Sequence, residues 1–284
     1  MRAIDVHSHL STQEGSIQYS EEVRKGMEAY YRFKTTYKTE DEMAQDFRQA
    51  DVKGLIIAWD SEHNMGTKPV PSDYVAKLCD KYPDVFIGGW CCVDPWRGKG
   101  AVNEIERSVK ELGMMGVKFQ GIAQAFFPDD PMMYPLYETI VALDVPVMFH
   151  TGTTGIGAGS PGGGGFKLKY TRPIPHMDDI AADFPKMKII MAHYGWPWQD
   201  EQIAVLLHKN NVYCELSGWS PKYFSDSFRK EVGGRLQDKF MFGTDYPVLS
   251  PERLINDYHQ VGFTDQVLEK VLYKNAIRIL NLKL

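Results

Sequence analysis

The chain has 284 residues, a net charge of −5 and an apolar fraction of 43%. This length and composition allow one large globular core, and the acidic balance argues against nucleic acid as a partner. No stretch approaches the roughly 20 apolar residues that a membrane helix requires, and no secretion signal precedes the first apolar run. Because the four cysteines include no C-x-x-C pair, we expect reduced thiols and a cytoplasmic protein.

Short apolar runs alternate along the chain with stretches whose apolar residues are three or four apart. The first pattern is typical of buried strands, and the second, as at Leu136, Ile140 and Leu143, is typical of helices. We predict eight strands, at residues 3–10, 54–59, 85–93, 116–120, 145–150, 188–193, 212–217 and 240–244. Eight parallel strands that alternate with helices form the (β/α)8 TIM barrel, an α/β fold. A doubly wound open sheet is the alternative, but no G-x-G-x-x-G loop follows the first strand.

Two segments interrupt this alternation. Residues 11 to about 40 separate the first strand from its helix, and we expect them to form a short helical insertion. Residues 152–165 are rich in glycine and follow the fifth strand. They are interpreted either as a mobile loop over the barrel mouth or as a flexible linker without a role. We therefore expect a single barrel domain over residues 1–284, with its insertion after strand 1.

Polar residues stand at or near the ends of five of the predicted strands. They are His7 and His9, Lys118, His150, His193 and Asp245. A buried strand has no reason to carry an imidazole or a carboxylate unless something satisfies it, and a divalent metal at the barrel mouth would do so. His7 and His9 are two residues apart on one strand, so both side chains are expected on one face. Three imidazoles and a carboxylate suit zinc, with manganese second.

Several motifs together resemble the amidohydrolase superfamily, in its amidohydrolase-2 branch, over essentially the whole chain. They are IDVHSHL, GVKFQGIAQAFFPDDPMMYPLYE, MFHTG, MAHYGWPW, FGTDYP and YKNAIRIL. That branch includes aminocarboxymuconate-semialdehyde decarboxylase and γ-resorcylate decarboxylase. The resemblance implies that His7, His9, His150 and Asp245 bind a single metal ion and that His193 is catalytic, as an acid or a hydrogen-bond donor. Relatives are often dimers, so it also implies a homodimer.

Lys118 leaves two metal arrangements open. Val117 and Phe119 are expected to face the helices, which turns Lys118 into the barrel. In two-metal members of the superfamily a carboxylated lysine bridges the ions and His193 is a ligand. In the one-metal branch, which this segment resembles, the lysine meets a substrate carboxylate instead. We expect one metal and a substrate-binding Lys118.

Other residues are candidates for substrate binding or for support of the metal site. Trp59 and Trp219 flank strand ends and would suit a flat, unsaturated or aromatic substrate, although aromatics on strands are more often core residues. Arg172 follows the glycine-rich loop and is able to clamp a carboxylate. Asp5 shares the strand and the face of His7. A metal ligand is one alternative, but we expect it to support an imidazole or to have a structural role.

The hypotheses for function are three. We favour a metal-dependent, non-oxidative decarboxylase of an unsaturated or aromatic carboxylic acid, in which His193 or Asp245 helps to protonate the carbon that loses CO2. The alternative is a hydrolase of an amide, lactone or ring C–C bond, with a metal-activated water and Asp245 as general base. A barrel without catalysis would lack ligands, and none is missing. The identity of the substrate stays open.

Overall fold

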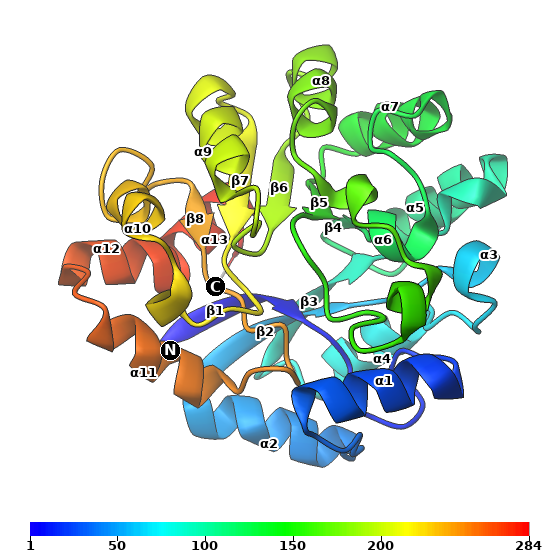
Figure 1. Cartoon of the computed structure of the whole chain (residues 1–284), viewed down its shortest axis with the longest axis horizontal. Helices are drawn as coiled ribbons and strands as arrows, with labels where there is room; N and C mark the ends of the chain where they lie inside the picture. Colours follow the sequence, from blue (N-terminus) through cyan, green and yellow to red (C-terminus); the bar gives the residue numbers. More distant parts are fainter. Residues whose placement is uncertain (284) are drawn as a thin grey trace.

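The computed structural model describes residues 1–283, so only the last residue of the predicted domain lies outside the described part. One sheet contains eight strands in the order of the sequence, and each neighbouring pair is parallel (Figure 1). The strands are β1 (Ala3–Ser8), β2 (Val52–Ile57), β3 (Phe86–Cys91), β4 (Gly116–Phe119), β5 (Val147–His150), β6 (Ile189–Ala192), β7 (Val212–Glu215) and β8 (Phe240–Met241). All eight predicted strands are confirmed, although β8 has two residues where five were predicted.

The short β8 explains how the sheet closes on itself. Beyond β8 the chain runs beside β1 without forming a regular ladder, and Ser8 pairs with Tyr246 in an isolated parallel bridge. Three backbone hydrogen bonds join the two edges: Val6 N to Phe242 O at 3.1 Å, Asp245 N to His7 O at 2.9 Å and His9 N to Tyr246 O at 2.8 Å. The predicted TIM barrel is therefore confirmed, and its seam lies between β1 and residues 242–246.

Helices surround the strands, as Figure 1 shows. One follows each strand in turn: α2 (Glu40–Ala50), α4 (Ser72–Lys81), α5 (Lys99–Lys110), α7 (Tyr134–Ala142), α8 (His176–Asp183), α9 (Gln199–His208), α10 (Asp226–Val232) and α11 (Pro251–Gln260). The others are α1 (Glu21–Tyr31), α3 (Glu62–Met65), α6 (Gly121–Gln124), α12 (Asp265–Glu269) and α13 (Asn275–Ile279), the last two joined by a π-helical turn over Lys270–Lys274. Among residues 1–283, none of the helices combines the length and the apolar character needed to cross a membrane.

The apolar core has two parts, one on each face of the sheet. Val117 and Phe119 of β4 belong to the large outer cluster between the strands and the helices. Met148 and Ile190 belong to a smaller inner cluster. Lys118 pairs with Met148 in the β4–β5 register, and residues paired in this way point to the same face. The side chain of Lys118 therefore enters the barrel, as predicted.

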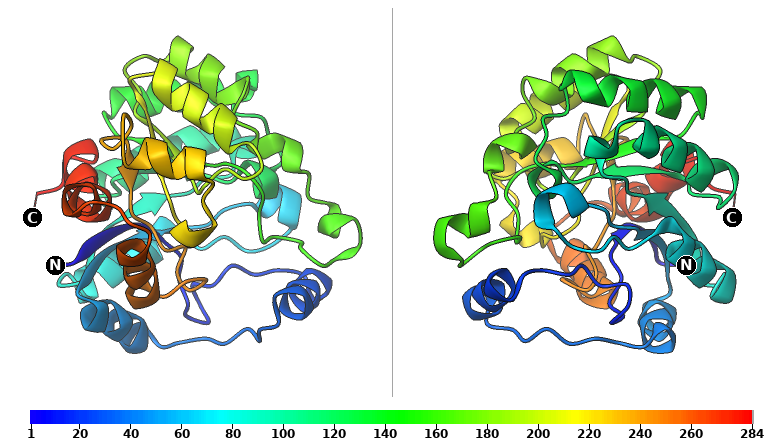
Figure 2. Two further views of the ribbon diagram at one scale, coloured as in Figure 1. Left: turned by 60° about the vertical axis from the view of Figure 1, so that its left-hand side comes forward. Right: turned by 90° about the vertical axis from the view of Figure 1, so that its right-hand side faces the viewer.

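The predicted insertion after strand 1 contains α1, which packs against the glycine-rich loop after β5. Ser20 begins the helix, and its side chain accepts a hydrogen bond from the backbone N of Val23. An added Cβ at Gly26 would lie 3.1 Å from the backbone N of Ser160, so the helix and the loop lie in close contact. Both views in Figure 2 place α1 beside this loop and apart from α2.

Candidate metal centre

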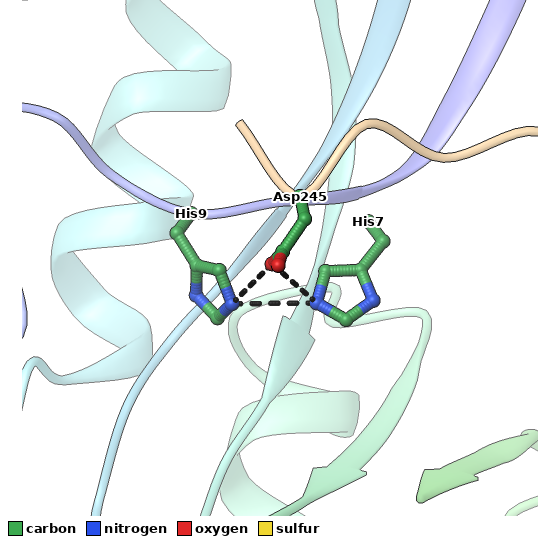
Figure 3. A group of neighbouring side chains, drawn as sticks. All are labelled: His7, His9 and Asp245. Atoms are coloured by element: carbon green, nitrogen blue, oxygen red, sulfur yellow. Dashed lines mark hydrogen bonds and ion pairs between the residues drawn. The ribbon is translucent and has the colours of Figure 1, made fainter. Parts of the chain in front are cut away.

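Three predicted metal ligands meet at the seam of the barrel. The Nε2 atoms of His7 and His9 are 3.3 Å apart, and each is 3.3 Å from the same carboxylate oxygen, Oδ1 of Asp245 (Figure 3). Ligands held by zinc at its usual bond lengths in a tetrahedron are about 3.3–3.4 Å from one another. The separation of these donor atoms therefore fits a single small divalent ion.

The backbone is shaped locally to bring these side chains together. The register between β1 and β2 shifts between Asp5 and Ser8, and such a bulge re-aims the side chains that follow it. His193 and Asp245 both adopt left-handed conformations, with φ of 74° and 60°. Such a conformation costs a residue other than glycine on the order of 1–3 kcal/mol and persists where surrounding contacts hold it. At Asp245 one such contact is its backbone hydrogen bond to His7.

Glu215, at the end of β7, sets the orientation of His7. Its Oε1 atom lies 2.7 Å from Nδ1 of His7, and the buried carboxylate also accepts hydrogen bonds from the backbone N and the hydroxyl of Ser217, at 2.9 and 3.1 Å. Because an ionised carboxylate only accepts, it holds a proton on Nδ1 of His7 and leaves Nε2 as a lone-pair donor towards Asp245.

His7, His193 and Glu215 form a second group whose potential ligand atoms lie within 4.8 Å of one another. We assign Glu215 to orientation rather than to metal binding, because its 2.7 Å contact with His7 is a hydrogen-bond distance and its oxygens already serve other donors. The sequence analysis did not assign Glu215 to the site. A carboxylate at the end of the run VYCE is the same kind of signal that identified the other polar residues.

His150 and His193 form a buried pair beside this cluster. Nδ1 of His150 lies 2.9 Å from Nε2 of His193. The remaining nitrogen of His150 faces the carbonyl oxygen of Thr153 at 3.0 Å. That of His193 faces the carbonyl oxygen of Ser217 at 3.1 Å and its hydroxyl oxygen at 2.9 Å, and the hydroxyl donates its own proton to Glu215. Carbonyls only accept, so in the neutral rings both facing nitrogens carry lone pairs. Two lone pairs at this distance repel each other unless a cation lies beside them, and a metal ion would be such a cation.

The protonation states of the cluster favour cation binding. Burial, together with the charge of Lys118, lowers the pKa of His7 well below its ordinary value. Burial likewise lowers the pKa of His193 to about 4. Burial opposes ionisation of Asp245, but the hydrogen bond with His9 and the nearby His7 outweigh it and hold the pKa of Asp245 well below its ordinary value. Neutral imidazoles and an ionised carboxylate are the donors that divalent metals require.

Lys118 lies fully buried in the barrel, and its Nζ atom has no hydrogen-bond partner within residues 1–283. Burial lowers the pKa of Lys118 to about 8, although the charges of Glu215 and Asp245 favour the ammonium form. A buried amine without a partner is costly, and buried polar groups are normally satisfied. Lys118 is therefore suited to an acidic ligand.

The two predicted tryptophans lie at different distances from the centre. The ring of Trp59, which is buried, is 5.9 Å from the ring of His9, centroid to centroid. Trp219 packs against Tyr194, with 5.7 Å between centroids. An added Cβ at the preceding residue, Gly218, would lie 3.2 Å from Asp245 Oδ2. Trp219 is therefore the next residue after one that lies against Asp245.

The structure does not bring Arg172 to the cluster. Its guanidinium is about half exposed and forms an ion pair with Glu201 at 2.6 Å. Asp5 does not join the donor cluster either. Its carboxylate accepts hydrogen bonds from the backbone N of His7 and of Thr244, at 3.1 and 3.0 Å, and so ties β1 to the segment after β8.

Known proteins resemble this chain in sequence. A family model described as Amidohydrolase matches residues 4–282. A γ-resorcylate decarboxylase of Polaromonas sp. is 23% identical in an alignment 248 residues long that covers 74% of this chain and 75% of that protein. A 2-keto-4-carboxy-3-hexenedioate hydratase of Sphingobium sp. is 29% identical in an alignment 135 residues long that covers 44% of this chain and only 39% of the hydratase.

Solved structures share the fold at lower identity. An uncharacterised TIM-barrel protein from Bordetella bronchiseptica is 22% identical, with a TM-score of 0.80 over 99% of both chains. A 5-carboxyvanillate decarboxylase from Novosphingobium aromaticivorans, solved as a mutant with bound manganese and a nitrobenzoic acid, is 17% identical, with a TM-score of 0.64 over 99% of this chain and 97% of that one. At these identities the likeness concerns the fold.

Proposed function

This chain belongs to the amidohydrolase family, and from that premise we propose that it is a metal-dependent, non-oxidative decarboxylase of an aromatic or unsaturated carboxylic acid. The observation that carries the proposal is Lys118, a buried amine without a partner beside a cluster of metal-ligand type. A substrate carboxylate would satisfy this amine. Relatives described as decarboxylases of aromatic acids support the same reaction class.

His7, His9 and Asp245 would hold one divalent ion, with His150 as the fourth ligand that the resemblance implies. When bound, the ion would supply Lewis-acid polarisation of a substrate oxygen. Zinc, which the sequence analysis favoured, rests on the chemistry of the donors alone. Manganese is bound in the structure of a family relative, so both ions belong in the test.

The remaining residues have separate tasks in the proposed reaction. Lys118 would bind and orient the carboxylate, and Trp59, beside His9, would contact the flat body of the substrate. The bond between the carboxylate and the adjacent carbon breaks, CO2 leaves, and the electron pair stays on that carbon. A proton delivered by way of His193 or Asp245 then completes the product. Arg172 would bind the substrate carboxylate only after its ion pair with Glu201 is broken.

Hydrolysis of an amide, lactone or ring C–C bond stays the alternative. One observation favours it over other chemistries: Asp245 is an ionised carboxylate next to three imidazoles and would serve as a general base towards water. The similarity to a hydratase, whose reaction also uses water, points the same way. The two reactions differ in the fate of solvent oxygen, because hydrolysis places it in the product and decarboxylation does not.

The test is CO2 release by the chain loaded with zinc or with manganese. The panel includes 2,6-dihydroxybenzoate, 5-carboxyvanillate and muconate-like acids, in H2(18)O. We expect CO2 from at least one acid without 18O in the organic product, and a loss of at least 100-fold in kcat/KM in Lys118→Met with unchanged metal content. Absence of CO2 from every acid with both metals, or 18O in the organic product, would overturn the proposal.

A further inference from the structure

A cavity of about 300 Å³ lies between the insertion, the segment after β2 and the glycine-rich loop after β5. Its walls are Tyr19, Ser20 and Val23 from the insertion, Asn64 and Met65 from α3, and Gly164, Gly165 and Phe166 from the loop. None of these residues carries a formal charge. A charged group placed here would lose its hydration without gaining an ion pair, so the cavity favours an uncharged occupant.

One chain of contacts connects this cavity with the metal centre. Met65 Sδ lies 2.9 Å from the hydroxyl of Ser61, which accepts a hydrogen bond from Trp59 Nε1 at 2.8 Å, and the ring of Trp59 is 5.9 Å from that of His9. The walls of the cavity belong to the segments that follow the C-terminal ends of β1, β2 and β5. The cavity therefore lies at the same end of the barrel as His9 and Asp245.

The volume and the polar groups of the cavity limit what fits. A cavity of roughly 150 Å³ is enough to hold benzene. This one is about twice as large. Its polar groups are neutral: the Tyr19 phenol, the Ser20 hydroxyl and the Asn64 amide, whose Nδ2 atom donates to the carbonyl of Ala123 at 2.9 Å and leaves Oδ1 as an acceptor. Val23, Met65 and Phe166 supply the apolar walls.

We propose that this cavity is the subsite for the end of the substrate opposite its carboxylate, and that it takes an uncharged, ring-sized group. The inference rests on the proposed function, since Lys118 and the metal ligands hold the acidic end. It names a substrate class: acids that carry a second ring or an equally bulky neutral extension. Val23 and Met65 are then residues that determine specificity.

The experiment compares three probes on the metal-loaded full chain: 2-hydroxybenzoate and its 4-phenyl and 5-phenyl derivatives. Affinity is measured by isothermal titration calorimetry, and CO2 release is followed in parallel. We expect at least one phenyl derivative to bind at least tenfold more tightly than 2-hydroxybenzoate. Val23→Trp and Met65→Trp fill the cavity from opposite walls, so each should remove this preference. Val23→Trp, which lies on α1 and away from the Ser61–Trp59 contact, should bind 2-hydroxybenzoate within twofold of wild type.

Ala29→Phe is the matched control, because it adds a ring to an exposed position of the same helix, α1. It should leave all three affinities unchanged. If Val23→Trp fails to fold, Met65→Trp decides the result. The inference is overturned if neither phenyl derivative is preferred, or if the cavity variants weaken all three acids equally. A size preference in binding, with no CO2 released from these probes or from the acids used to test the proposed function, would contradict the proposed reaction and leave the subsite standing, so the two failures are distinguishable.

Discussion

Glu215 shows how one buried carboxylate can orient a proposed metal ligand without binding the ion itself. It accepts the Nδ1 proton of His7, and the opposite nitrogen is thereby left with its lone pair towards Asp245 and His9. Its backbone lies on β7, so the orientation of a β1 histidine depends on a strand on the other side of the seam. Carboxylates in this role typically contribute 10- to 100-fold to metal affinity.

Replacement of Glu215 by Gln should therefore weaken zinc and manganese binding by about 10- to 100-fold, because the amide is a weaker acceptor and presents an NH2 group to Ser217. Chelator competition measures the affinity, and circular dichroism checks the fold. Glu201→Gln, which removes the surface partner of Arg172, is the matched control and should bind metal as wild type does. Equal affinity in both variants would refute the role assigned to Glu215.

In the protein without substrate, we expect Lys118 to lower the free energy of unfolding. Its amine is buried without a partner, so Lys118→Met should raise the free energy of unfolding by about 1–3 kcal/mol. Urea unfolding of the metal-free chain measures this change. The exposed Lys230→Met should change it by no more than about 0.5 kcal/mol. A loss of stability in Lys118→Met would mean that the ammonium group is satisfied by contacts within the protein.

At the scale of elements, the seam between β1 and β8 positions the centre. β8 ends at Met241, and the chain continues through Gly243 to Asp245 while it follows β1. At Gly243 there is no room for a side chain, because an added Cβ would lie 2.5 Å from Glu215 Oε2 and 3.1 Å from the Cβ of His7. The glycine thus lets the seam approach the residues that orient the metal ligands.

Gly243→Ala should destabilise the fold by about 1–3 kcal/mol through overpacking, and it should weaken metal binding by displacing His7 or Glu215. Chemical unfolding and chelator competition measure the two effects. The control is Gly100→Ala in α5, where an added Cβ meets nothing closer than 3.7 Å and the helix gains a better helix former. If Gly243→Ala unfolds and binds metal as the wild type does, the close approach at the seam has no energetic role.

The order of the strands and the strand ends that form the candidate site could be predicted from the sequence. The signal is an imidazole or a carboxylate at the end of an otherwise apolar run, where burial disfavours such a group. His7, His9 and Asp245 were predicted to meet on this basis, and the structure places them together. The extent of β8 could not be predicted, because closure uses irregular hydrogen bonds that leave no periodic pattern. The position of Arg172 depends on Glu201, 29 residues away, and a sequence alone does not reveal that pairing.

At the scale of the whole molecule, the proposed metal ligands span the closure of the barrel. His7 and His9 come from β1 and its end, and Asp245 comes from the segment after β8, so an ion bound between them would fasten the first strand to the last. The regular ladder is missing at this point, and the edges are joined by scattered backbone hydrogen bonds and by the contacts of Asp5 with Thr244. Metal binding and stability of the barrel should therefore be coupled.

An ion that binds only the folded chain adds roughly 2.7 kcal/mol at a hundredfold excess over Kd. For a chain of this size that corresponds to a rise in Tm of about 5 °C. Thermal unfolding with and without zinc or manganese measures it. His9→Ala should abolish the rise, whereas His208→Ala, at an exposed position, should retain it. A rise that survives in His9→Ala would place the ion elsewhere.

The central claim, a single divalent ion held by His7, His9 and Asp245, is tested most directly by elemental analysis of the full chain purified without chelators. We predict about one equivalent of zinc or manganese per chain, lost in the double variant His7→Ala/His9→Ala and retained in His208→Ala. About two equivalents would contradict the one-metal arrangement and would make Lys118 and His193 metal ligands. No metal in the purified chain, and none taken up from added zinc or manganese, would contradict the metal centre itself.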